Sequence, residues 1–285
     1  MYPNPLPWGS IDSMRVSALA ILGVSGVFAL GVGAASAEDA APVADRAKST
    51  YVRALQPAQA ARPFAVGEKL TYNAKINFLH VGTGTMTIVG IEEIRGQPAF
   101  HSSFRVKGRM LFFSVNDHYE SWFDTTSFAS LRYKQDIDEG SYERERTYEI
   151  FPERQTFSEN GEPEQPGVSQ PLDDGSFIYF VRTLSLDLGQ TYEFNRYFKP
   201  DRNPVRLEVL RKESIRVPAG EFNAIVVRPS IKAKGTKGIF SDDSKTEIWF
   251  SDDSLRLMLR MKSGLAFGTL QLELKDIDRG NVGGP

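Results

Sequence analysis

Apolar and polar positions alternate along most of the chain between residues 63 and 278. In KLTYNAKINF one face is apolar and carries Leu70, Tyr72, Ala74, Ile76 and Phe78. The same period of two recurs over 205–209, 221–226 and 269–275. Such alternation predicts antiparallel strands with one buried and one solvated face. Turn residues recur at short intervals, so the pattern predicts roughly a dozen strands in a mainly β domain, either a highly curved antiparallel sheet or an incomplete β-barrel.

The period changes to that of a helix in the segment LDDGSFIYFVRTLSLDLG. Asp173 and Asp174 are candidate N-cap residues. An apolar stripe follows at helical spacing and consists of Phe177, Phe180, Val181 and Leu184. Because so short a helix is not stable alone, we expect the segment 174–184 to pack on the inner face of the sheet as a plug or lid.

The first 62 residues differ in composition from the rest of the chain. Arg15 precedes an uncharged apolar run, and Ala35-Ser36-Ala37 matches the small-residue cleavage site of a signal peptide. We therefore expect an exported protein that resides in the periplasm. The alternative is an uncleaved anchor, since the apolar run is nearly long enough to span a membrane. The predicted organisation is a signal peptide over 1–37, a disordered tether over 38–62, one β domain over 63–278 and a frayed tail over 279–285.

Composition narrows the classes of function. The chain has no cysteine, which excludes a lipid-modified cysteine, a disulfide and a thiolate nucleophile. Lys and Arg number 34 against 36 Asp and Glu, so no basic excess is available to bind nucleic acid. Gly82 and Gly84 lack the third glycine and the following helix of a phosphate-binding loop. We therefore expect no cofactor.

An acidic motif, Phe-Ser-Asp-Asp-Ser, occurs at 240–244 and again at 250–254. Ten extended residues span on the order of 33 Å, so the two copies cannot share one ion unless the chain folds back between them. Neither copy has the glycine that the sharp bend of a calcium loop needs. Asp and Ser start turns by bonding their own backbone. We interpret the copies as turns at the two ends of one strand and expect no metal site.

The cluster NDHYESWFD holds the most suggestive polar side chains. His118 beside Asp117 or Glu120 has the composition of a general base with its carboxylate, as in a hydrolase. The competing interpretation is a cross-strand polar pair on the solvated face. No serine lies in a Gly-x-Ser-x-Gly motif, and the three histidines are not at metal-ligand spacing. We therefore assign no catalytic residue.

A sheet of this width is able to enclose an apolar cavity. The stretch RMLFF at 109–113, which contains a continuous apolar run from Met110 to Phe113, is a candidate for its mouth, although burial in the core is the default interpretation. The predicted ligand-lining residues are Tyr72, Ile76, Phe78, Met110, Phe112, Phe177, Phe180, Phe222 and Leu272.

Four stretches of the chain resemble the DUF3108 family of exported bacterial proteins. They are FAVGEKLTYNAKINFLHVGTGTMTI, DDGSFIYFVRTLSLDLGQTYEF, VPAGEFNAIVVRP and KGIFSDDSKTEIWFSDDSLRLMLRMKSGLAFGTLQLEL, and they occur in order over nearly all of 64–278. One departure is local: Leu257-Met258 stands where such sequences often carry a proline. The resemblance implies an exported, β-rich envelope protein, and it transfers no residue role because the family has no established activity.

Three functions remain open at this point. The favoured one is a non-enzymatic binding or carrier module of the cell envelope for an apolar or amphipathic molecule or a protein partner. The alternatives are a hydrolase that uses His118 with Asp117 or Glu120, and a structural or assembly factor of the envelope. An enzyme requires titratable groups that converge in the main cavity, whereas a carrier requires an apolar one.

Overall fold

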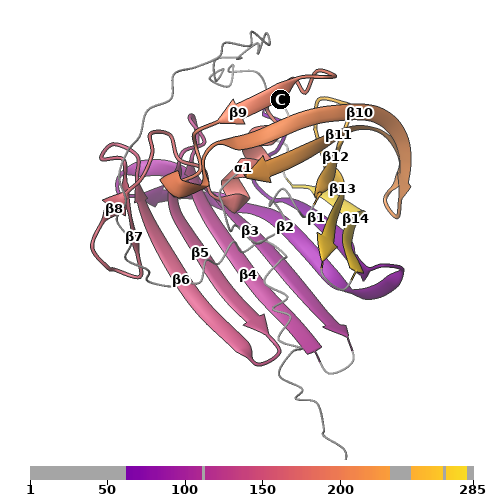
Figure 1. Ribbon diagram of the computed structural model, residues 1–285, viewed down its shortest axis with the longest axis horizontal. Helices are drawn as coiled ribbons and strands as arrows, with labels where there is room; N and C mark the ends of the chain where they lie inside the picture. Colours follow the sequence, from indigo (N-terminus) through magenta and orange to yellow (C-terminus); the bar gives the residue numbers. More distant parts are fainter. Residues whose placement is uncertain (1–61, 111–112, 232–244, 266–267, 281–285) are drawn as a thin grey trace, which may run out of the picture.

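The structure is a computed structural model that describes residues 62–110, 113–231, 245–265 and 268–280. The predicted signal peptide, nearly all of the tether, the first acidic repeat and the end of the tail lie outside these residues. Within them, fourteen strands form one antiparallel sheet, and a single α-helix is present (Figure 1). This confirms the mainly β class and the curved, incompletely closed sheet predicted from the alternation.

The elements follow one another with few long connections. In chain order they are β1 (Glu68–Ile76), β2 (Leu79–Ile94), β3 (Gln97–Met110), β4 (Phe113–Asp124), β5 (Ser130–Glu139), β6 (Tyr142–Phe151), β7 (Thr156–Glu159), β8 (Gln165–Pro166), α1 (Asp174–Val181), β9 (Thr191–Phe194), the 3-10 turn η2 (Pro200–Arg202), β10 (Val205–Val217), β11 (Gly220–Ile231), β12 (Glu247–Ser251), β13 (Met258–Leu265) and β14 (Gly268–Arg279).

The sheet is a meander that joins its first strand to its last. Apart from β8 and β9, each strand pairs with its neighbours in the chain, and β1 pairs in addition with β14, for example Ala74 with Leu272. The two edges of the sheet are therefore β8 and β9, which do not pair with each other. The chain between these edges carries α1, and the helix lies in the hollow of the curved sheet (Figure 1).

The helix begins where the sequence predicts and ends earlier. Asp173 is the N-cap: its carboxylate accepts bonds from the backbone of Gly175 and Ser176, and the Ser176 hydroxyl accepts one from the Asp173 backbone in return. The helix stops at Val181 instead of Leu184. It is also buried on all sides, because Ile178 and Tyr179 are as enclosed as the predicted stripe. A helix inside a curved sheet has apolar neighbours in every direction.

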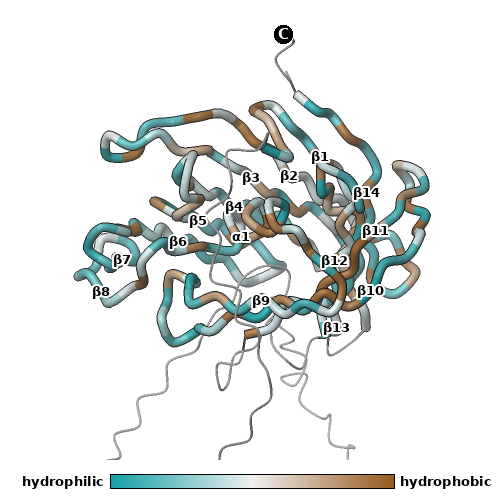
Figure 2. Tube along the Cα trace, turned by 90° about the horizontal axis from the view of Figure 1, so that it is seen from above, coloured by the Kyte–Doolittle hydropathy of each residue, from teal (hydrophilic) through white to brown (hydrophobic). Residues whose placement is uncertain are grey.

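Aromatic rings hold the helix to the sheet. The Tyr179 ring lies 4.9 Å from that of Phe64 and 5.6 Å from that of Phe123, between ring centroids. The Phe180 ring packs edge-on against that of Phe194 at 5.3 Å. In Figure 2 the strongly apolar stretches of the trace include α1 and the nearby strands β11 and β12. The core therefore occupies the concave side of the sheet, around α1.

The end of the helix is attached to the start of the sheet by a buried ion pair. Arg182 donates from Nη1 and Nη2 to the two carboxylate oxygens of Glu68, at 2.5 and 2.9 Å. Its guanidinium also donates to the backbone oxygens of Pro63 and Leu255. The two side chains are 0% and 3% exposed, so this cluster of bonds joins three distant parts of the chain without contact to water.

Candidate functional site

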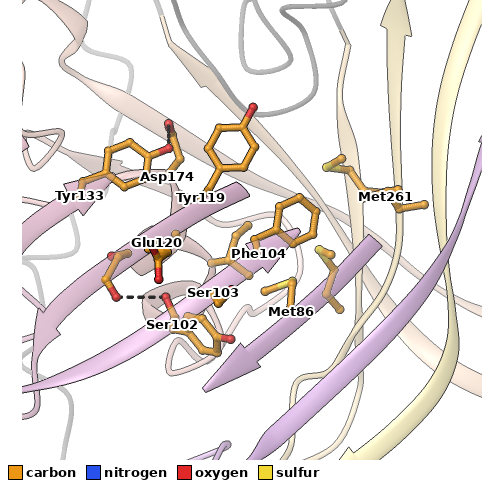
Figure 3. A pocket seen from close by; sticks show the side chains of 15 residues that line it. Met86, Ser102, Ser103, Phe104, Tyr119, Glu120, Tyr133, Asp174 and Met261 are labelled. Atoms are coloured by element: carbon orange, nitrogen blue, oxygen red, sulfur yellow. Dashed lines mark hydrogen bonds between the residues drawn. The ribbon is translucent and has the colours of Figure 1, made fainter. Parts of the chain in front are cut away.

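The inner face of the sheet holds a small cavity beneath α1. Its lining is mostly apolar and includes Met86, Phe104, Met258 and Met261, with Tyr133 and Asp174 at the helix end (Figure 3). Its volume is about 30 Å³. A water molecule needs roughly 10–15 Å³ of such volume, whereas small-molecule sites have about 300–1,000 Å³. The cavity is therefore far too small for a small-molecule ligand of the predicted apolar or amphipathic kind.

The residues predicted to line a ligand lie in different places in the structure. Leu272 borders the cavity. Tyr72, Phe177 and Phe180 are core residues, and the Tyr72 hydroxyl donates to the backbone oxygen of Met258 at 3.1 Å. Ile76 and Phe222 are half-buried and pack against the core. Phe112 lies outside the described residues, as does the side chain of Met110. A role of any of them in ligand binding stays a prediction.

Phe78 corrects the predicted inner face of the first strand. Its side chain is 86% exposed. The alternation holds as far as Ile76, but Asn77 has a φ of 55°, which turns the chain into β2. A left-handed residue ends the extended geometry on which the period of two depends. Phe78 therefore lies in a hairpin turn, outside the hollow of the sheet.

Buried carboxyl groups lie on the inner face near the helix and at the far end of β5. Asp174 accepts from the Tyr133 and Tyr197 hydroxyls at 3.0 and 3.3 Å, and burial together with the neighbouring Asp173 raises its pKa to about 7. Burial and the Asp117 carboxylate raise the pKa of Glu139 to about 8. Asp117 and Glu139 are 1% and 3% exposed, so ionising both would place two like charges side by side away from water.

The opposite face of the sheet carries an open groove across β1–β4. Its volume is about 560 Å³, within the range of small-molecule sites. Its lining is polar and comes from all four strands: Lys69, Thr85, Thr87, Val89, His101, Ser103, Arg105, His118 and Glu120. We call this the outer groove. None of the predicted ligand-lining residues contributes to it.

A chain of bonded side chains runs along the floor of the outer groove. His101 lies between two carboxylates, with Nδ1 2.7 Å from Glu92 and Nε2 3.0 Å from Glu120. Its ring stacks on Trp122 at 4.2 Å between centroids, and the indole Nε1–H donates to Glu92 at 2.7 Å. The imidazole is therefore fixed in position and orientation by three neighbours.

His118 lies closest to Ser103, and of the two carboxylates proposed for it only Glu120 is within reach. Its Nε2 lies 2.9 Å from Ser103 Oγ and 3.9 Å from Glu120 Oε1. Asp117 points to the other face of the sheet, where its carboxylate accepts from Tyr119 and from the backbone of Asp138. The pairing of His118 with Asp117 is therefore wrong, because adjacent residues of a strand face opposite ways. Burial lowers the pKa of His118.

The second acidic repeat forms a turn. Asp253 Oδ1 accepts from the Ser251 hydroxyl and from the backbone of Leu255 and Arg256, at 2.7, 2.9 and 3.2 Å. Asp252 forms ion pairs with Lys212 and Arg256. In the described part of the chain, no group of three or more His, Cys, Asp or Glu side chains is placed to hold a metal ion. The first repeat lies outside that part.

Comparison with known families now identifies the chain. The model of the family described as "Protein of unknown function (DUF3108)" matches residues 71–275. The chain belongs to the DUF3108 family. This confirms the resemblance, and no curated protein matches the DUF3108 chain in sequence.

One solved structure supports the fold of this DUF3108 protein. A beta-barrel-like protein of the domain of unknown function DUF1849 from Brucella abortus is similar with a TM-score of 0.53 and 9% identity, over 76% of this chain and 98% of that one. A candidate exported protein with a YmcC-like fold from Bacteroides fragilis has a TM-score of 0.29 and 11% identity, over 76% and 97% of the two chains. At 9% identity the likeness to the Brucella abortus protein concerns the fold alone.

The outer groove was not found from the sequence of this DUF3108 protein. Alternation places Lys69, Ser103, Arg105 and Glu120 on solvated faces, which is the only signal the sequence carries for them. Their convergence depends on the register of four strands. No helix in the described part of the chain is long and apolar enough to cross a membrane.

Proposed function

We propose that this DUF3108 protein is an exported envelope module that binds a small molecule in the outer groove and performs no reaction on it. The observation that carries the proposal is the contrast in volume, about 560 Å³ in the groove against about 30 Å³ beneath the helix. A ligand of ordinary size fits the first and not the second. Binding at the groove replaces the carrier hypothesis of an enclosed apolar ligand.

Fixed side chains support a binding role. His101 is held by Glu92, Glu120 and Trp122, so the groove offers a polar surface that does not need to be ordered when a ligand arrives. Preorganised groups reduce the entropic cost of binding. A protein partner that inserts a polar side chain into the groove would bind to the same polar groups.

Native mass spectrometry of protein purified from its own envelope tests the proposal. Thr87 lies in the groove between Lys69 and Ser103, so Thr87→Trp fills the space. Ser114, an exposed residue of β4 outside the groove lining, gives the matched control Ser114→Trp. We expect a co-purified mass on the wild type and on the control that is absent from Thr87→Trp. The same mass on all three proteins, or none on any, would exclude a groove ligand.

Export is tested separately. The apolar run and Ala35-Ser36-Ala37 motivate cleavage before Glu38. N-terminal sequencing of protein from the envelope fraction is expected to begin at Glu38. A mature chain that retains Arg15 would instead support an uncleaved anchor.

A hydrolase remains the second candidate because one contact favours it. Ser103 Oγ lies 2.9 Å from His118 Nε2, which is the distance of a nucleophile from its general base. Ester hydrolysis that is lost in both Ser103→Ala and His118→Gln, with folding intact by circular dichroism, would establish this function. Equal background rates in wild type and variants would reject it.

A further inference from the structure

The outer groove has an ordered floor because its residues face one another across four strands. One row consists of Lys69, Thr87, Ser103 and Glu120, each opposite the next in the pairing of β1 to β4. A second row consists of Thr85, Arg105 and His118. Neighbouring strands are about 4.8 Å apart, and residues two apart along a strand are separated by roughly 7 Å. Three hydroxyl groups therefore lie between the side chains of Lys69 and Arg105.

These two cations are not neutralised by the protein. Neither Lys69 nor Arg105 forms an ion pair with any residue in the described ranges, and both residues are exposed. Lys75 and Arg260, by contrast, both pair with Glu273, whereas the exposed Lys107, two residues from Arg105 on β3, has no ion pair in the described ranges but lies outside the groove lining. The one carboxylate in the groove lining, that of Glu120, is already bonded to His101 at 3.0 Å. The groove lining therefore holds two cations without an ion-pair partner against the single carboxylate of Glu120.

We propose that the outer groove recognises a phosphate group, held between Lys69 and Arg105 above the hydroxyls of Thr87 and Ser103. A phosphate monoester has a charge of about −1.5 to −2 and three strong acceptor oxygens. Arginine and lysine bind it through charge-assisted hydrogen bonds, and neutral hydroxyls complete its shell. A carboxylate has only two oxygens and fills this donor set less completely. The inference deepens the proposed function, since it names the ligand chemistry of the same groove.

The volume of the groove indicates that phosphate is part of a larger ligand. About 560 Å³ exceeds the space of a single phosphate group, and Val89, at 49% exposure, adds an apolar contact to the lining. A phospholipid headgroup and a soluble phosphomonoester share this chemistry. The experiment therefore needs one lipid probe and one soluble probe that carry the phosphate group.

Binding is measured with two probes and four proteins. The probes are glycerol 1-phosphate, by calorimetry, and phosphatidylcholine vesicles with and without phosphatidic acid, by co-sedimentation. The variants are Lys69→Ala, Arg105→Ala and the control Lys107→Ala, an exposed lysine on the same strand as Arg105 but outside the groove lining. We expect each groove variant to weaken binding by about tenfold or more, as for a lost charge-assisted bond, and the control to bind as wild type.

The outcomes distinguish a lipid headgroup from a soluble phosphomonoester, and they show whether the phosphate assignment or the groove itself is wrong. Binding of glycerol 1-phosphate and of vesicles identifies recognition of any phosphomonoester, whereas binding only of vesicles that contain phosphatidic acid identifies a lipid headgroup. No saturable binding of either probe, or an equal loss in Lys107→Ala, overturns the proposal. A co-purified ligand without phosphorus that Thr87→Trp displaces would overturn the phosphate assignment and leave the groove as the binding site.

Discussion

Arg182 at the end of α1 and Glu68 at the start of β1 form a two-bond ion pair that is almost completely excluded from solvent. The bonds cross a separation of 114 residues in the chain. The helix is therefore bound to the strand that joins the two ends of the meander. Loss of one partner would leave the other charge buried without compensation.

That ion pair gives the first prediction. Arg182→Met is expected to lower the free energy of unfolding by about 3–5 kcal/mol, since an unpaired buried carboxylate remains. The double variant Arg182→Met with Glu68→Leu is expected to lose less than the sum of the single variants. Urea unfolding measures both. The exposed pair Arg216–Glu221 is the control, and Arg216→Ala should change stability by less than about 1 kcal/mol.

The second prediction concerns the aromatic packing of the helix. Phe180 is 1% exposed and contacts the rings of Phe128 and Phe194. Phe180→Ala is expected to cost about 3–5 kcal/mol in urea unfolding. Phe78→Ala, at a residue 86% exposed, should be within about 0.5 kcal/mol of wild type. A loss below about 1 kcal/mol for Phe180→Ala would place the helix outside the cooperative core.

The third prediction follows from the raised pKa of Glu139, about 8 against an ordinary 4.5. The folded protein retains a proton that the unfolded chain releases. The stabilisation from this group is complete below pH 4.5 and is lost as the pH rises toward 8. The free energy of unfolding should therefore fall across this window, with a slope of at most about 1.4 kcal/mol per pH unit from one proton. Glu139→Gln should flatten the slope, and Glu221→Gln, at an exposed site, should not.

The fourth prediction concerns the acidic turn. Asp253→Ala removes the acceptor of three hydrogen bonds and is expected to lower stability by about 1–2 kcal/mol. Millimolar calcium should leave the melting temperature of wild type unchanged, because the carboxylate is occupied by donors of its own turn. A large calcium-dependent rise that Asp252→Asn with Asp253→Asn abolishes would show that the turn holds an ion.

The sequence was informative where structure depends on near neighbours. Alternation from Leu70 to Ala74 identified a buried face correctly, and Asp173 identified the start of the helix. Both signals are local: one comes from the two-residue period of a strand, the other from a side chain that bonds a backbone group three residues on. The burial of Ile178, which is not part of the predicted apolar stripe, depends on the whole hollow of the sheet.

The outer groove could not be predicted from local sequence patterns because it depends on the pairing register between strands. Lys69 and Ser103 meet through Thr87, and that alignment is altered wherever a strand carries a bulge, as β2 does between Ile88 and Gly90. A shift of one residue exchanges the two faces of a strand. Alternation alone placed His118 on the solvated face, but it could not show that Ser103 lies opposite Glu120 and within 2.9 Å of His118 Nε2.

The unpaired ends of the sheet have a consequence for self-association. A strand at an edge presents free backbone groups on which a second copy could grow a continuous fibre. At one end β8 is two residues long and includes Pro166, which has no amide hydrogen to donate. At the other end β9 has only four residues. A closed barrel avoids polymerisation by having no ends, whereas this sheet ends in two strands too short to serve as templates. Among the described residues it exposes a longer edge only where β9 leaves β10 beyond Glu208, and β7 leaves β6 before Tyr148, without a paired strand.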